Sequence, residues 1–245
     1  MVASAISVDS AVNHRARLAL VALLLLGVPG EAASDRVTFR TDDGIQIAAT
    51  WYEPSSRSAP AVILVPMLHR TRRDWDGVGA RLASEGIGAL AIDLRGHGDS
   101  AGVATEGEPP DYSAMVGDLS AARRFVASRV HGRVGIAGAS LGANLAALEA
   151  SGDPAIASLA LLSPSLDYRG LRIEAAVRKY GDRPALLVSS DDDPYATRSV
   201  KDLQKAGGGT REGLLLSQAG HGTTMLGRNA DLARVLVDWF RRTLL

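Results

Sequence analysis

Six short apolar runs follow one another along the chain from residue 61 onward. Each run has little polar alternation, which is typical of strands that are covered by other elements on both faces. The runs therefore predict a mainly parallel sheet. They occupy residues 61–66, 88–93, 133–138, 156–164, 184–190 and 213–218.

Segments of helical period separate these runs. In the last of them, five apolar residues recur at helical spacing and form one stripe that would pack onto a sheet. These residues are Leu232, Val235, Leu236, Trp239 and Phe240. The predicted helices cover residues 75–84, 113–128, 141–150, 197–205 and 231–243.

An antiparallel hairpin is predicted ahead of the first apolar run. Residues 36–40 and 45–52 flank the turn sequence TDDG, and two such segments around a turn are typical of a hairpin. A hairpin followed by alternating strands and helices indicates an α/β three-layer sandwich. With no internal repeat and no sign of a second core, we expect a single domain over residues 33–245.

Composition narrows the classes of protein that fit this pattern. Lysine plus arginine and aspartate plus glutamate both total 27, and the arginine pairs are short and scattered, so we expect no nucleic-acid partner. The chain has no cysteine, which excludes disulfides, thiol nucleophiles and thiolate metal sites. If the protein is an enzyme with a nucleophilic residue, that nucleophile is an oxygen.

The N-terminal residues 1–32 have the layout of a signal peptide. His14, Arg15 and Arg17 precede an apolar run over residues 18–28, and small residues at Gly30 and Ala32 follow it. The run of 11 residues is too short to span a bilayer comfortably. We therefore expect export to the periplasm or medium after cleavage, with no stable membrane span; an uncleaved segment would anchor the protein or form a buried helix.

Two stretches of the chain match Gly-x-Ser-x-Gly, around Ser100 and Ser140. A serine nucleophile needs a sharp turn between a strand and a helix, with small residues two positions before and after it. Ser140 has this context, because a predicted strand leads into it and a predicted helix leaves it. Ser100 stands several residues after its strand and before a Gly/Pro-rich loop, which favours a structural turn.

A base and an acid are available at the same edge of the predicted sheet. His221 follows the last strand, and the carboxyl ends of parallel strands lie together. A catalytic triad also needs a carboxylate that orients the base. The run Asp191, Asp192 and Asp193 follows the preceding strand, and periodicity alone leaves the choice among the three open.

The order Ser140, acid, His221, together with the elbow GASLG and the sequence DLRGHGDS, resembles the α/β-hydrolase superfamily over about residues 36–245. The resemblance implies that Asp193, which precedes a proline, is the acid of the triad, with Asp192 as the alternative. It also implies an oxyanion hole from the backbone N–H groups of Leu68, with Met67 as an alternative, and of Leu141. Pro66-Met67 stands where many members carry His-Gly.

These residues together predict a serine hydrolase that cleaves carboxylic esters or thioesters through an acyl-enzyme at Ser140. Only about twenty residues separate the strands that end at Pro164 and begin at Pro184, so we expect no large lid and a small-molecule substrate. Metal and cofactor are not required, and the oligomeric state is open. The alternatives are a peptidase of the prolyl-peptidase type and a non-catalytic exported binding protein.

Overall fold

The computed structural model describes Met1, residues 34–102 and residues 111–245. The predicted signal peptide lies outside the described residues except for Met1. The chain divides into two units, Met1–Gly30 and Glu31–Leu245. All that follows concerns the second unit.

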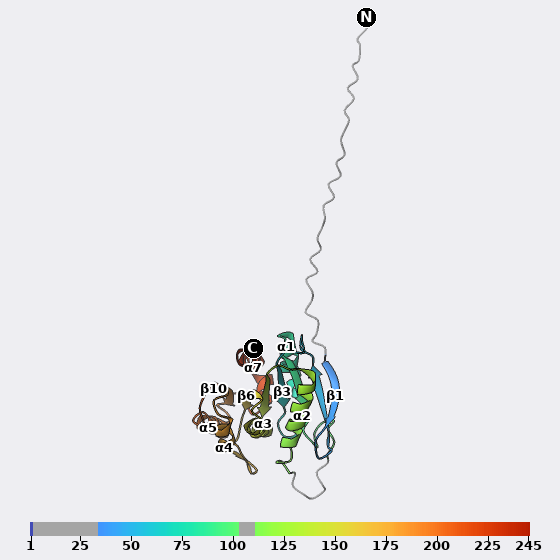
Figure 1. The fold of residues 1–245 in the computed structure, drawn as a ribbon. Coiled ribbons are helices and arrows are strands. Elements are labelled where there is room, and N and C mark those ends of the chain that lie inside the picture. The colour runs from blue at the N-terminus through green and yellow to red at the C-terminus, as the bar shows by residue number, and fades with distance from the viewer. Residues whose placement is uncertain (2–33, 103–110) are drawn as a thin grey trace. The chain divides into compact units, whose positions relative to one another are not determined.

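Eight strands form one mainly parallel sheet in the order β1-β2-β4-β3-β5-β6-β9-β10. Strand β1 pairs antiparallel with β2, and β2 pairs antiparallel with β4, whereas the remaining pairs are parallel. Figure 1 shows β1, β3, β6 and β10 following one another across the molecule. The predicted fold class is therefore confirmed. The strands are β1 (Ser34–Arg40), β2 (Gln46–Tyr52), β3 (Ala61–Val65), β4 (Gly88–Ile92), β5 (Val134–Ala139), β6 (Ile156–Leu162), β9 (Ala185–Ser190) and β10 (Arg211–Leu216).

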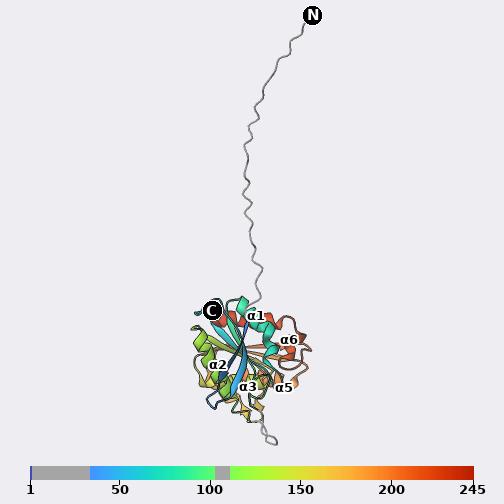
Figure 2. The same ribbon diagram turned by 90° about the vertical axis from the view of Figure 1, so that its right-hand side faces the viewer.

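Helices cover both faces of this sheet (Figures 1 and 2). Buried residues of α2, α3, α4 and α5 belong to the core on one face, and those of α1, α6 and α7 belong to the core on the other. In the described part of the chain, no helix is long and apolar enough to cross a membrane. The helices are α1 (Asp76–Ser84), α2 (Val116–Arg129), α3 (Leu141–Gly152), α4 (Glu174–Tyr180), α5 (Pro194–Leu203), α6 (Thr224–Arg228) and α7 (Leu232–Leu244).

The apolar stripe predicted near the C-terminus is the buried face of α7. Leu232, Leu236, Trp239 and Phe240 are each at most 1% exposed. Burial of side chains of this size contributes about 1.5–3 kcal/mol each, so the last helix is an integral part of the second core. Its stripe closes one outer layer of the sandwich.

Helix starts differ from their predicted positions by up to three residues. Helix α5 begins at Pro194 rather than at residue 197, because proline fits the first helical turn and the Asp193 side chain caps the helix by accepting from the Ala196 N–H. Helix α2 begins at Val116 rather than at residue 113, because residues 112–115 form turns. Two short elements between β6 and α4 were not predicted, the paired strands β7 (Asp167–Tyr168) and β8 (Leu171–Arg172).

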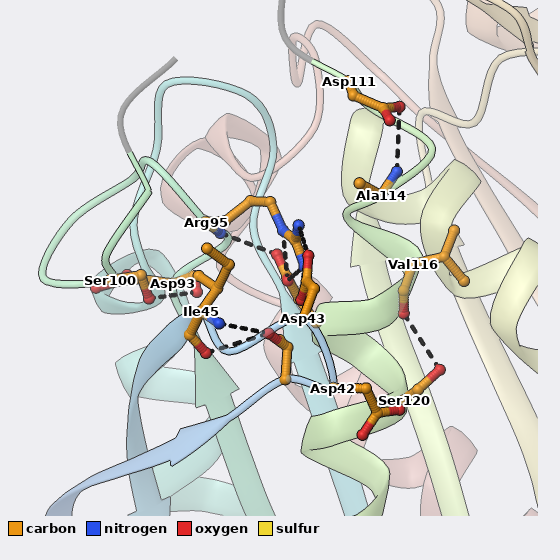
Figure 3. A network of polar contacts seen from close by, with 12 residues as sticks. Asp42, Asp43, Ile45, Asp93, Arg95, Ser100, Asp111, Ala114, Val116 and Ser120 are labelled. Atoms are coloured by element: carbon orange, nitrogen blue, oxygen red, sulfur yellow. Dashed lines mark hydrogen bonds and ion pairs between the residues drawn. The ribbon is translucent and has the colours of Figure 1, made fainter. Parts of the chain in front are cut away.

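A network of charged side chains ties the N-terminal hairpin to the rest of the sandwich (Figure 3). Arg95, which follows β4, bonds to Asp43 in the hairpin turn at 2.6 Å and to Asp118 in α2 at 2.7 Å. Asp118 is fully buried, and burial raises its pKa. Asp43 is exposed, and hydrogen bonds from Arg95 and then Thr41 lower its pKa from 3.8 to about 2.

The Asp43–Arg95 contact gives a pH-dependent contribution to stability. Because the pKa of Asp43 is lower in the folded state, the contribution is complete above about pH 4 and disappears as the pH falls towards 2. We expect Asp43→Asn to cost less than about 1 kcal/mol at pH 7, since solvent screens the pair. Urea unfolding of both proteins between pH 7 and pH 2 tests this, and a difference that persists unchanged at pH 2 would contradict it.

Candidate active site

Ser140 occupies the turn between β5 and α3. Its backbone has φ 50° and ψ −115°, a conformation that is strained for a residue with a side chain. Its N–H donates to the Leu162 carbonyl of the neighbouring strand at 2.8 Å. The turn is therefore fixed to the sheet, at the edge where the strands end.

The two glycines around Ser140 stand where side chains would collide with backbone. A Cβ at Gly138 would lie 2.2 Å from the Gly142 carbonyl oxygen, and a Cβ at Gly142 would lie 2.4 Å from the Pro66 carbonyl oxygen. The second contact shows that the start of α3 lies against the segment that follows β3. Glycine at these positions is what allows the turn to close.

We expect Gly142→Ala to destabilise the protein by at least about 2 kcal/mol, because the methyl group overpacks rigid backbone. Gly152→Ala, in the same helix, has no atom within 4 Å of the new Cβ and is the matched control. It should leave stability within about 1 kcal/mol of the wild type or increase it. Thermal and urea unfolding of the pair test this, and equal stability of the two variants would exclude the steric explanation.

His221 links Ser140 to a carboxylate. Its Nε2 lies 2.8 Å from Ser140 Oγ, and its Nδ1 lies 2.6 Å from Asp193 Oδ2. A carboxylate only accepts hydrogen bonds, so Nδ1 carries the proton and donates to Asp193. Nε2 is then the acceptor for the Ser140 hydroxyl, which is the arrangement in which the histidine can take up the serine proton.

The three consecutive aspartates bind three different positions of the loop between β10 and α6, which carries His221. Asp191 accepts the Gln218 N–H at 2.7 Å, and Asp192 accepts the Gly220 N–H at 3.0 Å, while Asp193 binds the imidazole. The Gln218 N–H and the Ser217 hydroxyl lower the pKa of Asp191, and the Ser190 hydroxyl with the Gly220 N–H lowers that of Asp192. Asp193, rather than Asp192, is the one beside the histidine.

The residues expected at the oxyanion hole lie on segments that meet beside Ser140. Leu68 is in a turn closed by the Arg70 N–H donating to the Met67 carbonyl at 3.1 Å, and His69 in this turn has φ 60°. Leu141 is the first residue of α3, where the helix has N–H groups without an intrahelical partner. Leu68 and Leu141 also pack in the same core cluster.

Ser100, the other Gly-x-Ser-x-Gly serine, has a structural environment. Its hydroxyl donates to the Asp93 carbonyl at 2.8 Å and accepts the Ala48 N–H at 2.8 Å. These bonds tie the loop after β4 to the hairpin strand β2. In the described residues no histidine ring bonds to the Ser100 hydroxyl: the Ser100 N–H donates to the His97 carbonyl at 3.0 Å, and the His97 ring contacts the Arg95 carbonyl at 3.0 Å.

Sequence reasoning did not find the residues that hold the histidine in place. The Ser163 hydroxyl accepts the Gly222 N–H at 3.0 Å, and the Thr224 hydroxyl accepts the His221 N–H at 3.1 Å. Because an isolated serine or threonine belongs to no sequence motif, the role of Ser163 and Thr224 could not be predicted from the sequence. The described residues also contain no group of three or more His, Cys, Asp or Glu side chains that could hold a metal.

A mainly parallel sheet between two helical layers, with a serine on the strand–helix turn after β5, defines an α/β hydrolase. Residues 56–206 match the model of the family described as serine aminopeptidase, S33. Since this match spans more than half of the chain, the chain belongs to that family of hydrolases. The matched region includes Ser140 and Asp193 but not His221. No curated protein sequence matches the chain.

Solved structures share this fold at low sequence identity. Dienelactone hydrolase from Anabaena variabilis has a TM-score of 0.74 and 16% identity, covering 88% of this chain and 100% of its own. Est1E from Butyrivibrio proteoclasticus, determined with ferulic acid bound, has 0.69 and 19%, covering 84% and 99%. An esterase of Pyrococcus furiosus has 0.69 and 17%, covering 86% and 93%.

Proposed function

We propose that this hydrolase cleaves small carboxylic esters or thioesters through an acyl-enzyme at Ser140. The observation that carries the proposal is the continuous hydrogen-bonded chain from Ser140 Oγ through His221 to Asp193. A serine hydroxyl is a weak nucleophile unless a base removes its proton in the transition state. Here the base is in contact with the hydroxyl, and a carboxylate orients the base.

The geometry supports a two-stage reaction. His221 Nε2 takes the proton of Ser140 as Oγ bonds to the substrate carbonyl carbon, and the carbonyl electrons move onto its oxygen. Backbone N–H groups of Leu68 and Leu141 stabilise that oxyanion. The leaving alcohol or thiol then takes the proton from Nε2, and a water molecule repeats the sequence on the acyl-enzyme to release the acid.

The short connection between β6 and β9 favours small substrates. It contains only the two-residue strands β7 and β8 and the helix α4, so no separate lid domain stands between residues 163 and 184. His221 is half exposed, which also indicates an accessible site. Two solved structures that share the fold are named an esterase and a dienelactone hydrolase. These names support an ester as the first substrate class to test.

A peptidase is the second candidate function, because the family that the chain belongs to is described as serine aminopeptidase. The same three residues would then attack an amide carbonyl. The two functions are distinguished by comparing the hydrolysis of aminoacyl and dipeptidyl amides with that of p-nitrophenyl esters and acyl thioesters. Turnover of amides at a rate comparable to that of esters would favour the peptidase.

The first experiment is labelling of the purified protein with a fluorophosphonate, followed by peptide mapping. We expect a single adduct, on Ser140. A wild-type protein that forms no adduct and turns over neither esters nor amides would exclude the hydrolytic proposal and favour the non-catalytic binding protein. An adduct on Ser100 would show that the wrong serine has been assigned.

A further inference from the structure

Asp74 bridges the two segments that flank Ser140. It lies in the short 3-10 helix η1 (Arg72–Trp75). Its carboxylate accepts Nε and Nη2 of Arg70 at 2.8 and 2.7 Å, and it also accepts the hydroxyl of Thr223. The Asp74 side chain is 13% exposed, whereas the Arg70 side chain is 49% exposed. Thr223 is buried, so the contact between Asp74 and Thr223 is the part of the bridge that is shielded from solvent.

Both ends of the bridge are close to residues proposed to act in the reaction. Arg70 closes the turn that contains Leu68, and Thr223 stands two residues after His221. The same two segments also touch through apolar atoms, because a Cβ at Gly222 would lie 2.5 Å from Met67 Sδ. The bridge therefore joins the proposed oxyanion donor to the loop of the proposed base.

The loop of the base is the better anchored of the two segments. Gln218, Gly220 and Gly222 donate their N–H groups to Asp191, Asp192 and Ser163. By contrast, the backbone of residues 67–70 makes one hydrogen bond among the described residues, the one that closes the turn itself. The turn thus depends on side-chain contacts for its position. In the part of the chain that the structure describes, the polar contacts of this kind are those of the Arg70–Asp74–Thr223 bridge.

We infer that Asp74 is a positioning residue, which transfers the fixed position of the His221 loop to the turn that holds the Leu68 N–H beside Ser140. The inference rests on the proposed function, because it assigns to this turn the stabilisation of the oxyanion. An N–H donor contributes fully only when it points at the site where negative charge develops. A displacement of about 1 Å in such a group can cost up to about 100-fold in rate.

Thr223→Val and Thr223→Ser form the matched pair that tests the bridge. Valine has the shape of threonine without the hydroxyl, whereas serine keeps the hydroxyl. We expect Thr223→Val to lower kcat per titrated active site by about 10- to 100-fold with KM changed less than about twofold. Thr223→Ser should retain kcat within about threefold, since the bond to Asp74 can still form.

Active-site titration with the fluorophosphonate separates positioning from misfolding. A merely structural defect would reduce the number of titratable sites and leave kcat per site unchanged. An arylboronic acid gives a further readout, because its tetrahedral adduct on Ser140 carries negative charge where the oxyanion forms. Its affinity should fall in Thr223→Val by a factor similar to that in kcat, and it should stay near the wild-type value in Thr223→Ser.

Hydrogen–deuterium exchange at the Arg70 N–H, which donates the hydrogen bond that closes the turn, tests the bridge without reference to activity. We expect faster exchange in Thr223→Val and wild-type exchange in Thr223→Ser. Unchanged exchange in Thr223→Val, or unchanged kcat per site in an active wild-type background, would overturn the role of Asp74. An inactive wild-type protein with faster exchange in Thr223→Val would overturn the proposed function and leave the structural bridge supported.

Discussion

Ser140→Ala is expected to lower kcat for ester hydrolysis by about 10⁶-fold, as is typical when a serine protease loses its nucleophile. The reason is that, among the residues that the structure describes, only Ser140 Oγ lies at hydrogen-bond distance from His221 Nε2, at 2.8 Å, and can form the acyl-enzyme. The variant should also lose all fluorophosphonate labelling. Steady-state kinetics on a p-nitrophenyl ester, with labelling as the second readout, measure both effects.

Ser100→Ala is the matched control for this substitution. Its hydroxyl joins Asp93 and Ala48, so its loss should cost about 1–3 kcal/mol of folding stability and leave labelling of Ser140 intact. Comparable loss of kcat per mole of folded protein in both variants would mean that Ser140 is not the particular residue on which hydrolysis depends. Full activity of Ser140→Ala would exclude the acyl-enzyme altogether.

Asp193→Asn is expected to lower kcat by about 10⁴-fold, a loss typical of the same change in another serine hydrolase triad. The carboxylate now accepts a hydrogen bond from the His221 Nδ1–H at 2.6 Å. An amide NH₂ in its place would favour the tautomer with the proton on Nε2, which cannot accept from Ser140. Kinetics across pH on folded, titrated protein measure the loss.

Asp192→Asn provides a neighbouring change of the same chemistry. Asp192 contacts the Ser190 hydroxyl and the Gly220 N–H, and an asparagine side chain can still accept from both. We expect kcat within about tenfold of the wild type, since only loop placement is affected. If Asp192→Asn were the more damaging of the two, the acid of the triad would have to be reassigned to Asp192.

The sequence pattern located the sheet and the candidate nucleophile because both depend on local signals. A buried strand reads as a continuous apolar run, and the elbow at Ser140 needs glycines at fixed spacing, so these features are visible without long-range contacts. Helix starts were less accurate. At α5 the cap by Asp193 and the proline after it override the apolar period, and the helix begins at Pro194.

Contacts between distant parts of the chain could not be predicted. Asp74 and Thr223 are 149 positions apart, and neither belongs to a motif. Likewise, the choice among Asp191, Asp192 and Asp193 depends on the path of the β10–α6 loop, which periodicity does not describe; only the family resemblance favoured Asp193. The export signal over residues 1–32 stays a prediction.

The three adjacent carboxylates also limit how this enzyme could be re-engineered. Asp191, Asp192 and Asp193 bind Gln218, Gly220 and His221 in the same order, so inserting or deleting one residue in either partner would shift every pairing at once. Libraries that vary loop length there should yield few active clones. The two-residue turn between Tyr168 and Leu171, which joins β7 to β8, carries none of these pairings and lies outside the buried core, so it is the better place to vary loop length.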